Sequence, residues 1–395
     1  MAEGTKTIKA TCLCGSAAHE ITLPVSDFPL KCYMCHCDSC RHMTGTLCLT
    51  VVFLTPDYTP SQDLLDKLTP FVFSRRITQY HCKTCGTQMV ARCLDDPDKA
   101  EPEVTWDAAT GTLEHFDDIM DVQGHEQVAD TLDGGFADLL ATVNEKPLER
   151  WAHHFRKGDQ LPLYWRTPKT QLDKPPTQDK LHAYCKCKGV QMWIARPSAQ
   201  SEKATAGQHW PEPSWPDVLV PHNSGPVSLP ENELWWLRAN RKKFLGGLCT
   251  CNSCRLAAGM ECVEWAFVPT ADITLDAEGK VPFSLPFGSL KSYRSSSKAT
   301  RYFCGTCGAM VFWHGDERPG LIDVAAGLLA APEGARAESW LEWRTERLSY
   351  REDAVDRAGS LVRGIEAGLN GYGKKIQGDA RPHEEVAKYI DTTKD

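Results

Sequence analysis

The 395-residue sequence lacks any apolar run that approaches the ~20 residues of a membrane-spanning helix. Its opening residues, MAEGTKTIKA, also lack the apolar core of a secretory signal peptide. Because both features are missing, we expect a cytoplasmic protein with no membrane partner.

A basic stripe is missing as well. The formal net charge is -8, and Lys6 and Lys9 are the only basic residues before Cys12. Domains that bind nucleic acids usually carry a clustered excess of Lys and Arg. We therefore expect no nucleic-acid partner and no role in chromatin.

The composition does not favour disorder either, because 42% of the residues are hydrophobic and 24% are charged, as in folded globular proteins. A chain of this length is too long for one ordinary core and fits two domains of about 200 residues each. Two domains are therefore the first expectation.

Cysteine, in contrast, is abundant, with 18 residues. In a long chain without an export signal, cysteines are more often metal ligands or catalytic thiols than disulfide partners. The spacing of the cysteines decides between these possibilities.

The cysteines form the same three motifs twice, in the same order. The first half contains Cys12-x-Cys14, Cys35-x-Cys37-x-x-Cys40 and Cys82-x-x-Cys85. The second half contains Cys185-x-Cys187, Cys249-x-Cys251-x-x-Cys254 and Cys304-x-x-Cys307. The flanking residues also agree, as in CHCDSCR and CTCNSCR. This pattern indicates an internal duplication.

The duplication predicts a first zinc domain over 1–168, a polar, proline-bearing linker over 169–180, and a second zinc domain over 181–376. A polar C-terminal tail follows at 377–395. The second domain carries a long insertion at about 196–245 that is rich in Pro and Trp. We expect this insertion either to wall a pocket or to cover a sheet edge.

Short apolar runs alternate with Gly and Pro breaks along most of the chain. The runs TLCLTVVFL at 46–54 and RYFCGTCGAMVFW at 301–313 are examples. This punctuation is typical of strands, whereas helical signals are few, at 128–143 and in the polar tail. The sequence predicts a mainly β fold of two tandem zinc-stapled domains with few short helices.

A closed metal site is expected in each half. In C-x-C on an extended segment, residues i and i+2 point to the same face, so the two sulfurs can act together. Joined to the later C-x-x-C, they give a four-thiolate site typical of structural zinc, although redox dithiols or iron are alternatives. The two predicted sets are Cys12, Cys14, Cys82 and Cys85, and Cys185, Cys187, Cys304 and Cys307.

The central motif supplies only three thiolates, which leaves a fourth zinc position for substrate. Three thiolates make the zinc a weak activator of water, but it can still bind an incoming thiol as thiolate. We therefore expect thiol chemistry, and up to four zinc ions per chain. The two predicted catalytic sets are Cys35, Cys37 and Cys40, and Cys249, Cys251 and Cys254.

A fourth protein ligand would close this open position. Cys32 is a candidate in the first half, but the second half has Gly246 at the equivalent place. His36 lies between two ligands and is a candidate catalytic residue, but Thr250 replaces it in the second half, which favours a place beside the ligands or at the surface over a place in the ligand set. His36 and the DTLDGG segment at 130–135 slightly favour the first half as the active one.

One arginine directly follows the last ligand of each open site. Arg41 and Arg255 are candidates to offset the thiolate charge or to hold a substrate carboxylate, and a purely structural role is an equal alternative. Three further cysteines follow no metal spacing and are expected to be buried thiols: Cys48, Cys93 and Cys262.

The ordered set C-x-C-G, C-x-C-x-x-C-R and C-x-x-C-G resembles the CENP-V/GFA family of glutathione-dependent formaldehyde-activating enzymes. DTLDGG at 130–135, AAGLL at 325–329 and WLEW at 340–343 also look like family segments. The resemblance implies a β-tent fold, structural four-cysteine sites and catalytic three-cysteine sites. It also implies carbon-sulfur lyase activity, with glutathione and formaldehyde giving S-hydroxymethylglutathione.

Two functions follow as competing hypotheses. The first is a zinc enzyme that makes or breaks a carbon-sulfur bond between a small-molecule thiol, with glutathione as a possible co-substrate, and an electrophilic carbon. The second is a zinc-stapled binding or scaffold protein without turnover. The tandem arrangement and the long insertion depart from the simplest family pattern, which is compatible with a larger or aromatic substrate.

Overall fold

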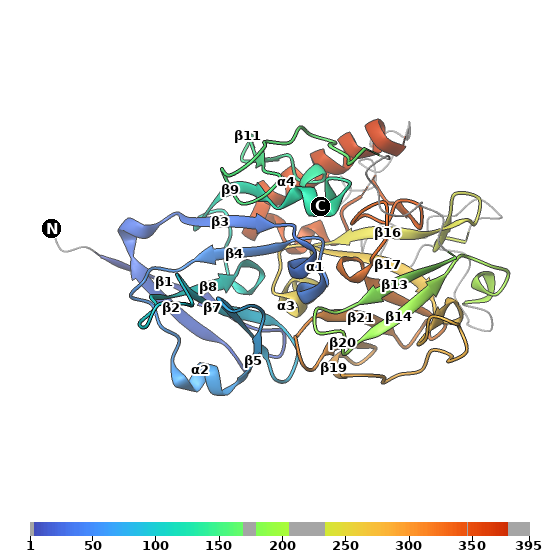
Figure 1. Cartoon of the computed structure of the whole chain (residues 1–395), viewed down its shortest axis with the longest axis horizontal. Coiled ribbons are helices and arrows are strands. Elements are labelled where there is room, and N and C mark those ends of the chain that lie inside the picture. Colours follow the sequence, from blue (N-terminus) through green and yellow to red (C-terminus); the bar gives the residue numbers. More distant parts are fainter. Residues whose placement is uncertain (1–3, 169–178, 205–233, 346, 378–395) are drawn as a thin grey trace, which may run out of the picture.

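The computed structural model describes residues 4–168, 179–204, 234–345 and 347–377. Most of the predicted linker, residues 205–233 of the insertion and nearly all of the predicted tail lie outside the described residues. Within the described ranges the chain is mainly β, as the sequence predicts (Figure 1).

The first half is built on an eight-stranded sheet with the spatial order β12-β9-β3-β4-β8-β7-β6-β5. Neighbouring strands are antiparallel except at β9, which is parallel to both β3 and β12. The strands are β3 (Leu30–Cys35), β4 (Leu49–Phe53), β5 (Leu68–Val72), β6 (Ile77–Cys82), β7 (Gln88–Leu94), β8 (Val104–Ala109), β9 (Met120–Glu126) and β12 (Glu149–Arg150).

The second half repeats this arrangement, with the order β15-β16-β17-β22-β21-β20-β19 and β23 paired to β16. β23 runs parallel to β16, just as β9 runs parallel to β3. The duplication in the sequence is therefore also a duplication of topology. The strands are β15 (Leu237–Arg238), β16 (Lys243–Cys249), β17 (Val263–Pro269), β19 (Leu290–Ser296), β20 (Ala299–Cys304), β21 (Met310–Gly315), β22 (Leu321–Ala325) and β23 (Leu341–Trp343).

Small sheets flank the two large ones. In each half, the loop that carries the C-x-C motif connects the first two strands of a small sheet. These sheets contain β1 (Thr5–Ala10) and β2 (His19–Pro24) in the first half, and β13 (Lys180–Tyr184), β14 (Gln191–Ala195) and β18 (Ile273–Thr274) in the second. A further hairpin joins β10 (Thr142–Val143) to β11 (Lys146–Pro147).

Helices are few among the described residues, and two of them begin at the central cysteine motif. The four α-helices are α1 (Asp38–Thr44), α2 (Gln62–Asp66), α3 (Asn252–Ala258) and α4 (Val355–Tyr372). None of these helices has the length and apolarity needed to cross a membrane. The region 128–143, a helical signal in the sequence, instead forms two short 3-10 turns and β10, because Gly134 and Gly135 take positive φ angles.

Helix α4 belongs to the second half of the sequence but packs on the first half (Figure 1). A Cβ atom added to Gly364 would lie 2.1 Å from the carbonyl oxygen of Thr142, and one added to Gly368 would lie 2.1 Å from that of Leu139. Glycine therefore lets the helix touch the backbone of the other half. The segment 181–376 therefore packs against the first half of the chain and is not a spatially separate domain.

The two halves also exchange an equivalent pair of backbone contacts. The amide of Gly111 donates to the carbonyl oxygen of Gly259 at 2.9 Å, and the amide of Gly327 donates to that of Gly45 at 2.9 Å. Gly45 and Gly259 end α1 and α3 with φ angles of 83° and 75°. Because each half makes the same hydrogen bond to the other, the two halves are related by an approximate two-fold axis.

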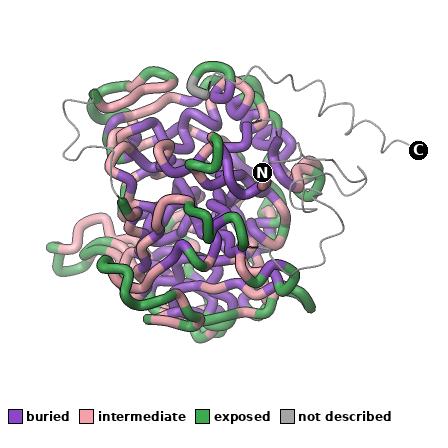
Figure 2. The backbone as a smooth tube through the Cα atoms, turned by 90° about the vertical axis from the view of Figure 1, so that its right-hand side faces the viewer, coloured by how far each residue is buried: buried purple, intermediate pink, exposed green. Residues whose placement is uncertain are grey.

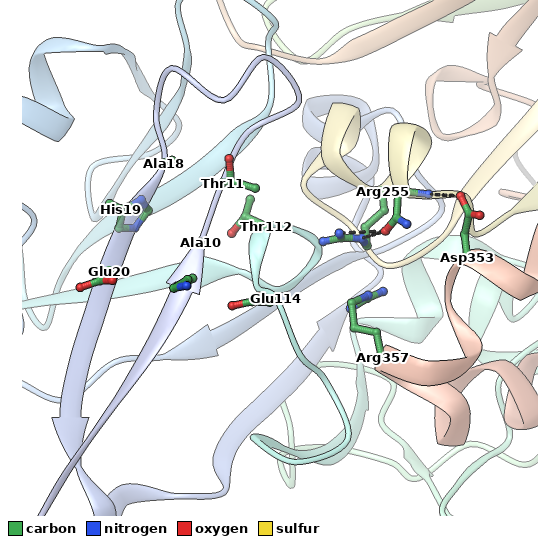
Figure 3. A pocket seen from close by; sticks show the side chains of 12 residues that line it. Ala10, Thr11, Ala18, His19, Glu20, Thr112, Glu114, Arg255, Asp353 and Arg357 are labelled. Atoms are coloured by element: carbon green, nitrogen blue, oxygen red, sulfur yellow. Dashed lines mark hydrogen bonds between the residues drawn. The ribbon is translucent and has the colours of Figure 1, made fainter.

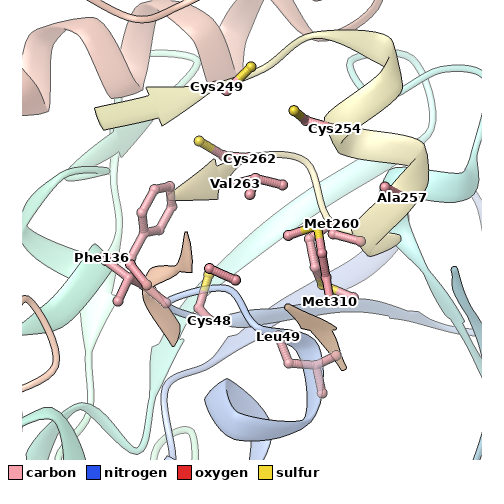
Figure 4. Packing of buried hydrophobic residues seen from close by; sticks show 14 of the residues in the cluster. Cys48, Leu49, Phe136, Cys249, Cys254, Ala257, Met260, Cys262, Val263 and Met310 are labelled. Atoms are coloured by element: carbon pink, nitrogen blue, oxygen red, sulfur yellow. The ribbon is translucent and has the colours of Figure 1, made fainter. Parts of the chain in front are cut away.

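One hydrophobic core contains buried residues of both halves. Figure 2 shows that buried segments fill the interior of the molecule. Cys48 and Cys262 occupy equivalent places in this core and are buried, as the sequence predicts (Figure 4). The amide of Thr50 lies 3.2 Å from the sulfur of Met260, which crosses from the other half. Cys93 differs, because it is only partly buried and its thiol faces Asp107.

A buried carboxylate also joins the halves. Glu264 on β17 is 1% exposed, and its Oε2 accepts a hydrogen bond from the amide of Leu47 at 2.8 Å. Burial raises the pKa of Glu264 from 4.5 to about 7. Because the folded state holds this proton more tightly than the unfolded chain, the contribution of Glu264 to stability falls as the pH rises from about 4.5 to about 7.

The substitution Gly327→Ala tests the contact between the halves. The added Cβ would lie 2.2 Å from the carbonyl oxygen of Thr46, so the backbone of one half must move. We expect a loss of about 1–3 kcal/mol or more in the free energy of unfolding, measured in urea. Gly247→Ala is the control, because its Cβ would meet nothing closer than 3.5 Å. Equal stability of the two variants would contradict the contact.

The substitution Glu264→Gln tests the buried carboxyl. Glutamine keeps an acceptor for the Leu47 amide but does not ionise. Above pH 8 we expect the variant to be more stable than the original chain by about 3 kcal/mol, and this difference should vanish near pH 4.5. Urea unfolding at both pH values measures it. A difference in stability between the two proteins that does not change with pH would contradict the raised pKa of Glu264.

Candidate metal centres

The fourteen cysteines of the repeated motifs lie in four groups, and within each group the sulfur atoms lie within 4.8 Å of one another. Each group could hold a metal ion. The four-sulfur groups are Cys12, Cys14, Cys82 and Cys85, and Cys185, Cys187, Cys304 and Cys307. The three-sulfur groups are Cys35, Cys37 and Cys40, and Cys249, Cys251 and Cys254.

The four-sulfur groups have the spacing that zinc requires. The sulfurs of Cys12 and Cys14 are 3.4 Å apart, and those of Cys187 and Cys304 are 3.5 Å apart. Tetrahedral zinc with bonds of about 2.3 Å places its sulfurs about 3.8 Å apart. The donor set therefore fits a closed zinc site in each half.

The architecture explains what each four-sulfur group connects. The C-x-C motif lies in the loop between two strands of a small sheet, whereas Cys82 and Cys304 end β6 and β20 of the large sheets. Glycines with positive φ, Gly86 and Gly308, turn the chain after the last cysteine. A metal here would fasten the small sheet to the large one.

The four-sulfur groups also lie against the opposite half. A Cβ added to Gly86 would lie 2.3 Å from the ring of Phe303, and one added to Gly308 would lie 2.5 Å from that of His81. His81 and Phe303 are equivalent residues, each directly before a cysteine ligand. The turn after C-x-x-C in each half therefore packs against an aromatic side chain of the other half, and the two contacts are related by the approximate two-fold axis.

Each three-sulfur group forms where a strand passes into a helix. Cys35 ends β3, Cys37 caps α1, and its sulfur accepts the amide of Cys40 at 3.4 Å. The second half repeats this geometry, with 3.3 Å between the sulfur of Cys251 and the amide of Cys254. Among the described residues, no further His, Cys, Asp or Glu side chain joins either group. Three sulfurs suit a metal with one position left for a ligand.

Cys32 does not join the first three-sulfur group. It lies three residues before Cys35 on β3, so the two side chains point to opposite faces of the strand. Cys32 faces the core together with Met34, and burial raises the pKa of its thiol above the ordinary value. The fourth ligand that the sequence leaves open for the first half is therefore not Cys32.

His36 points into the interior. Its Nε2 lies 2.9 Å from Nδ1 of His125, whose Nε2 lies 2.8 Å from the carbonyl oxygen of Leu140. Burial lowers the pKa of both rings, that of His125 to about 3. The DTLDGG segment lies close by, because a Cβ on Gly135 would be 3.7 Å from His36. The structure thus places His36 in a buried histidine pair, away from the three sulfurs.

The two arginines differ in their contacts. Arg41 is buried and pairs with Asp38 of the same helix. Arg255 donates from Nη1 to the carbonyl oxygens of Gly111 and Leu113 in the first half, and it also contacts Asn252. Figure 3 shows Arg255 at the edge of a hollow of about 570 Å³ between the halves. Arg255 thus holds the two halves together.

A pocket of about 370 Å³ opens beside the second three-sulfur group. All three of its cysteines line this pocket, together with the aromatic side chains of Trp265, Phe267 and Trp313. Arg301 also lines it; its Nη2 donates to Ser253 Oγ at 2.9 Å and lies 3.4 Å from the sulfur of Cys254.

Sequence reasoning missed Arg301 and the two tryptophans. Arg301 and Gln79 stand three residues before equivalent cysteines, in ATRYFC and ITQYHC. A position-by-position comparison of the two halves could therefore have identified these residues, because they differ where the rest of the repeat agrees.

A family model described as glutathione-dependent formaldehyde-activating enzyme matches the chain over residues 7–125 and 237–344. The two matched regions cover more than half of the chain and contain twelve of the fourteen repeated cysteines. Cys185 and Cys187 lie outside the second region. No curated protein and no solved structure matched.

Serine substitutions distinguish the two kinds of group. We expect Cys85→Ser and Cys307→Ser to lose one zinc each and several kcal/mol of stability, because these groups fasten two sheets. Cys37→Ser and Cys251→Ser should also lose zinc but keep nearly the original unfolding temperature. Metal content and thermal unfolding measure both effects.

Cys93→Ser is the control, because Cys93 belongs to no group, and this variant should keep all its zinc. Equal loss of stability in all four metal-group variants would contradict the division into structural and open sites.

Proposed function

The chain belongs to the family of glutathione-dependent formaldehyde-activating enzymes, and on this premise we propose that it is a zinc-dependent enzyme of carbon-sulfur bond chemistry. It would join a thiol to an electrophilic carbon or reverse that reaction, as a carbon-sulfur lyase does. The observation that carries this proposal is a three-sulfur group that opens onto a pocket.

The metal that suits this group is zinc, held in each half by the three cysteines of the central motif. When bound there, zinc supplies a positive centre that favours the thiolate form of an incoming thiol. Three thiolates weaken its ability to activate water, so addition of a thiol is favoured over hydrolysis. The four-sulfur groups would hold two further zinc ions as structural ligands.

The residues of the pocket have separate tasks in this proposal. Arg301 places a positive charge 3.4 Å from the sulfur of Cys254, which offsets the negative charge of the thiolates. Trp265 and Trp313 line the space beside the sulfurs and reduce the access of water. The polypeptide thereby orients the thiol and keeps the reacting carbon near it.

The reaction is an addition to a carbonyl group. The sulfur of the thiol bonds to the carbonyl carbon, the carbon-oxygen π bond breaks, and the proton of the thiol ends on the oxygen. Glutathione and formaldehyde would give S-hydroxymethylglutathione, as the description of the family suggests. The cytoplasm, where glutathione is abundant, is the compartment that suits this chemistry.

Exchange spectroscopy by NMR tests the proposal. With glutathione and formaldehyde, we expect the zinc-loaded chain to speed formation of the hydroxymethyl adduct above the spontaneous rate. The double variant Cys37→Ser, Cys251→Ser should lose at least 100-fold of this acceleration while remaining folded, because both open groups are disrupted. Cys93→Ser should keep it.

Full acceleration by the double variant would refute a role for the three-sulfur groups in turnover. Absence of acceleration by the original chain, with glutathione and with other thiols and aldehydes, would instead favour a zinc-stapled scaffold.

A further inference from the structure

A row of four side chains crosses the second sheet beside the three-sulfur group. Phe267, Asp323, Trp313 and Arg301 are successive cross-strand partners on β17, β22, β21 and β20. Cross-strand partners point to the same face of a sheet. All four residues line the 370 Å³ pocket.

The first half has the same row at the same register. Its members are Phe53, Asp107, Ala91 and Gln79, on β4, β8, β7 and β6. Phenylalanine and aspartate are kept in both rows, whereas tryptophan is replaced by alanine and arginine by glutamine. The two halves therefore share a frame but differ in the side chains beside the sulfurs.

A third difference follows the same pattern. Trp265 stands two residues before Phe267 on β17, on the same face of the strand, and lines the pocket. The equivalent residue of β4 is Val51, two residues before Phe53. At these three positions the second half therefore has two indole rings and one positive charge where the first half has valine, alanine and glutamine.

Arg301 is only 4% exposed and, like Arg41 in the first half, makes few hydrogen bonds. Beyond the contacts of its Nη2 with Ser253 and Cys254, its Nε and Nη1 have no hydrogen-bond partner among the described residues. A buried guanidinium is costly unless negative charge lies near it. The three cysteine sulfurs provide that charge as thiolates, and an incoming thiolate would add to it.

The neighbouring carboxylate does not neutralise Arg301, because it is already paired. Asp323 accepts two hydrogen bonds from Arg318, at 2.8 and 3.0 Å. The guanidinium carbon of Arg318 also lies 4.6 Å from the ring centroid of Trp313, so the pair supports the indole from one side. Trp313 is thus held in place, and Arg301 remains available to the sulfur group.

The walls of the pocket, more than its size, indicate the kind of substrate. About 370 Å³ lies in the range of pockets that hold organic ligands, which is room for a thiol together with a small carbonyl compound. Indole and phenyl walls favour flat aromatic groups over aliphatic ones of the same size. Glu352 and Asp353 also line the pocket, which disfavours a second anionic group there.

We propose that the second half holds the substrate pocket of this enzyme, and that the substrate carries an aromatic group next to the carbon-sulfur bond. This inference rests on the proposed function. It names the substrate class through Trp265 and Trp313, and it assigns Arg301 as the residue that favours thiolate at the second centre.

Binding of two matched thiols to the zinc-loaded full chain tests the inference, with calorimetry as the readout. Phenylmethanethiol should bind at least tenfold more tightly than cyclohexylmethanethiol, which has a similar size but no aromatic ring. Trp313→Ala and Trp265→Val, which introduce the residues of the first half, should remove this preference. Arg301→Gln should weaken both thiols by a similar factor. Val51→Ala, the control in the first half, should leave both affinities unchanged.

Turnover assays then show which reactant carries the aromatic group. Phenylmethanethiol with formaldehyde places it on the thiol, and glutathione with benzaldehyde places it on the carbonyl compound. Acceleration of either reaction, reduced at least tenfold in Trp313→Ala, supports the inference.

Two results would overturn the inference. One is equal binding of the two thiols together with no acceleration of either aromatic reaction, and the other is unchanged aromatic preference in Trp313→Ala and Trp265→Val. If glutathione and formaldehyde still react faster with the enzyme in that case, the proposed function stands without the aromatic pocket. Conversely, a preference for the aromatic thiol without any turnover would support the aromatic pocket and contradict the proposed enzymatic function.

Discussion

The structure depends on the reciprocal contact between Gly45 and Gly327 and between Gly259 and Gly111. Each contact joins the end of a metal-motif helix in one half to a turn in the other, with no room for a side chain between them. The two helices α1 and α3 are therefore fixed by the opposite half as well as by their own. Helix α4 adds a third tie, because its glycines rest on the backbone of the first half. As a result, the four cysteine groups belong to one folded unit with a shared core.

A frame that is shared in this way permits the two halves to diverge. The cysteine groups and the sheet order are present twice, so each half could hold a metal at an open three-sulfur group. The side chains of the row beside the sulfurs are not fully duplicated, because Gln79 and Ala91 of the first half stand at the positions that Arg301 and Trp313 occupy in the second. This asymmetry is the reason why we propose the second half as the substrate-binding one, whereas His36 and the DTLDGG segment favoured the first half in the sequence.

Spacing made the cysteine groups and the β-rich fold predictable. The repeated order of the motifs and the glycine turn after C-x-x-C indicate which sulfurs can meet, although the C-x-C pairs of the four-sulfur groups lie in loops and not on extended strands as expected. Helix α4 was missed because its four glycines usually count against a helix, whereas here two of them, Gly364 and Gly368, allow close packing on another backbone. The helical signal at 128–143 failed for a related reason, since Gly134 and Gly135 turn the chain. Arg301 was missed because its partners, Ser253 and Cys254, lie far from it in the sequence.

In the function that we propose, two closed four-sulfur sites hold the fold and two open three-sulfur sites bind thiol. X-ray absorption at the zinc edge of the fully loaded chain distinguishes the two kinds of site. We expect an average of about 3.5 sulfur ligands per zinc, which rises towards four when a thiol is added. Four sulfurs around every zinc before any thiol is added would contradict it.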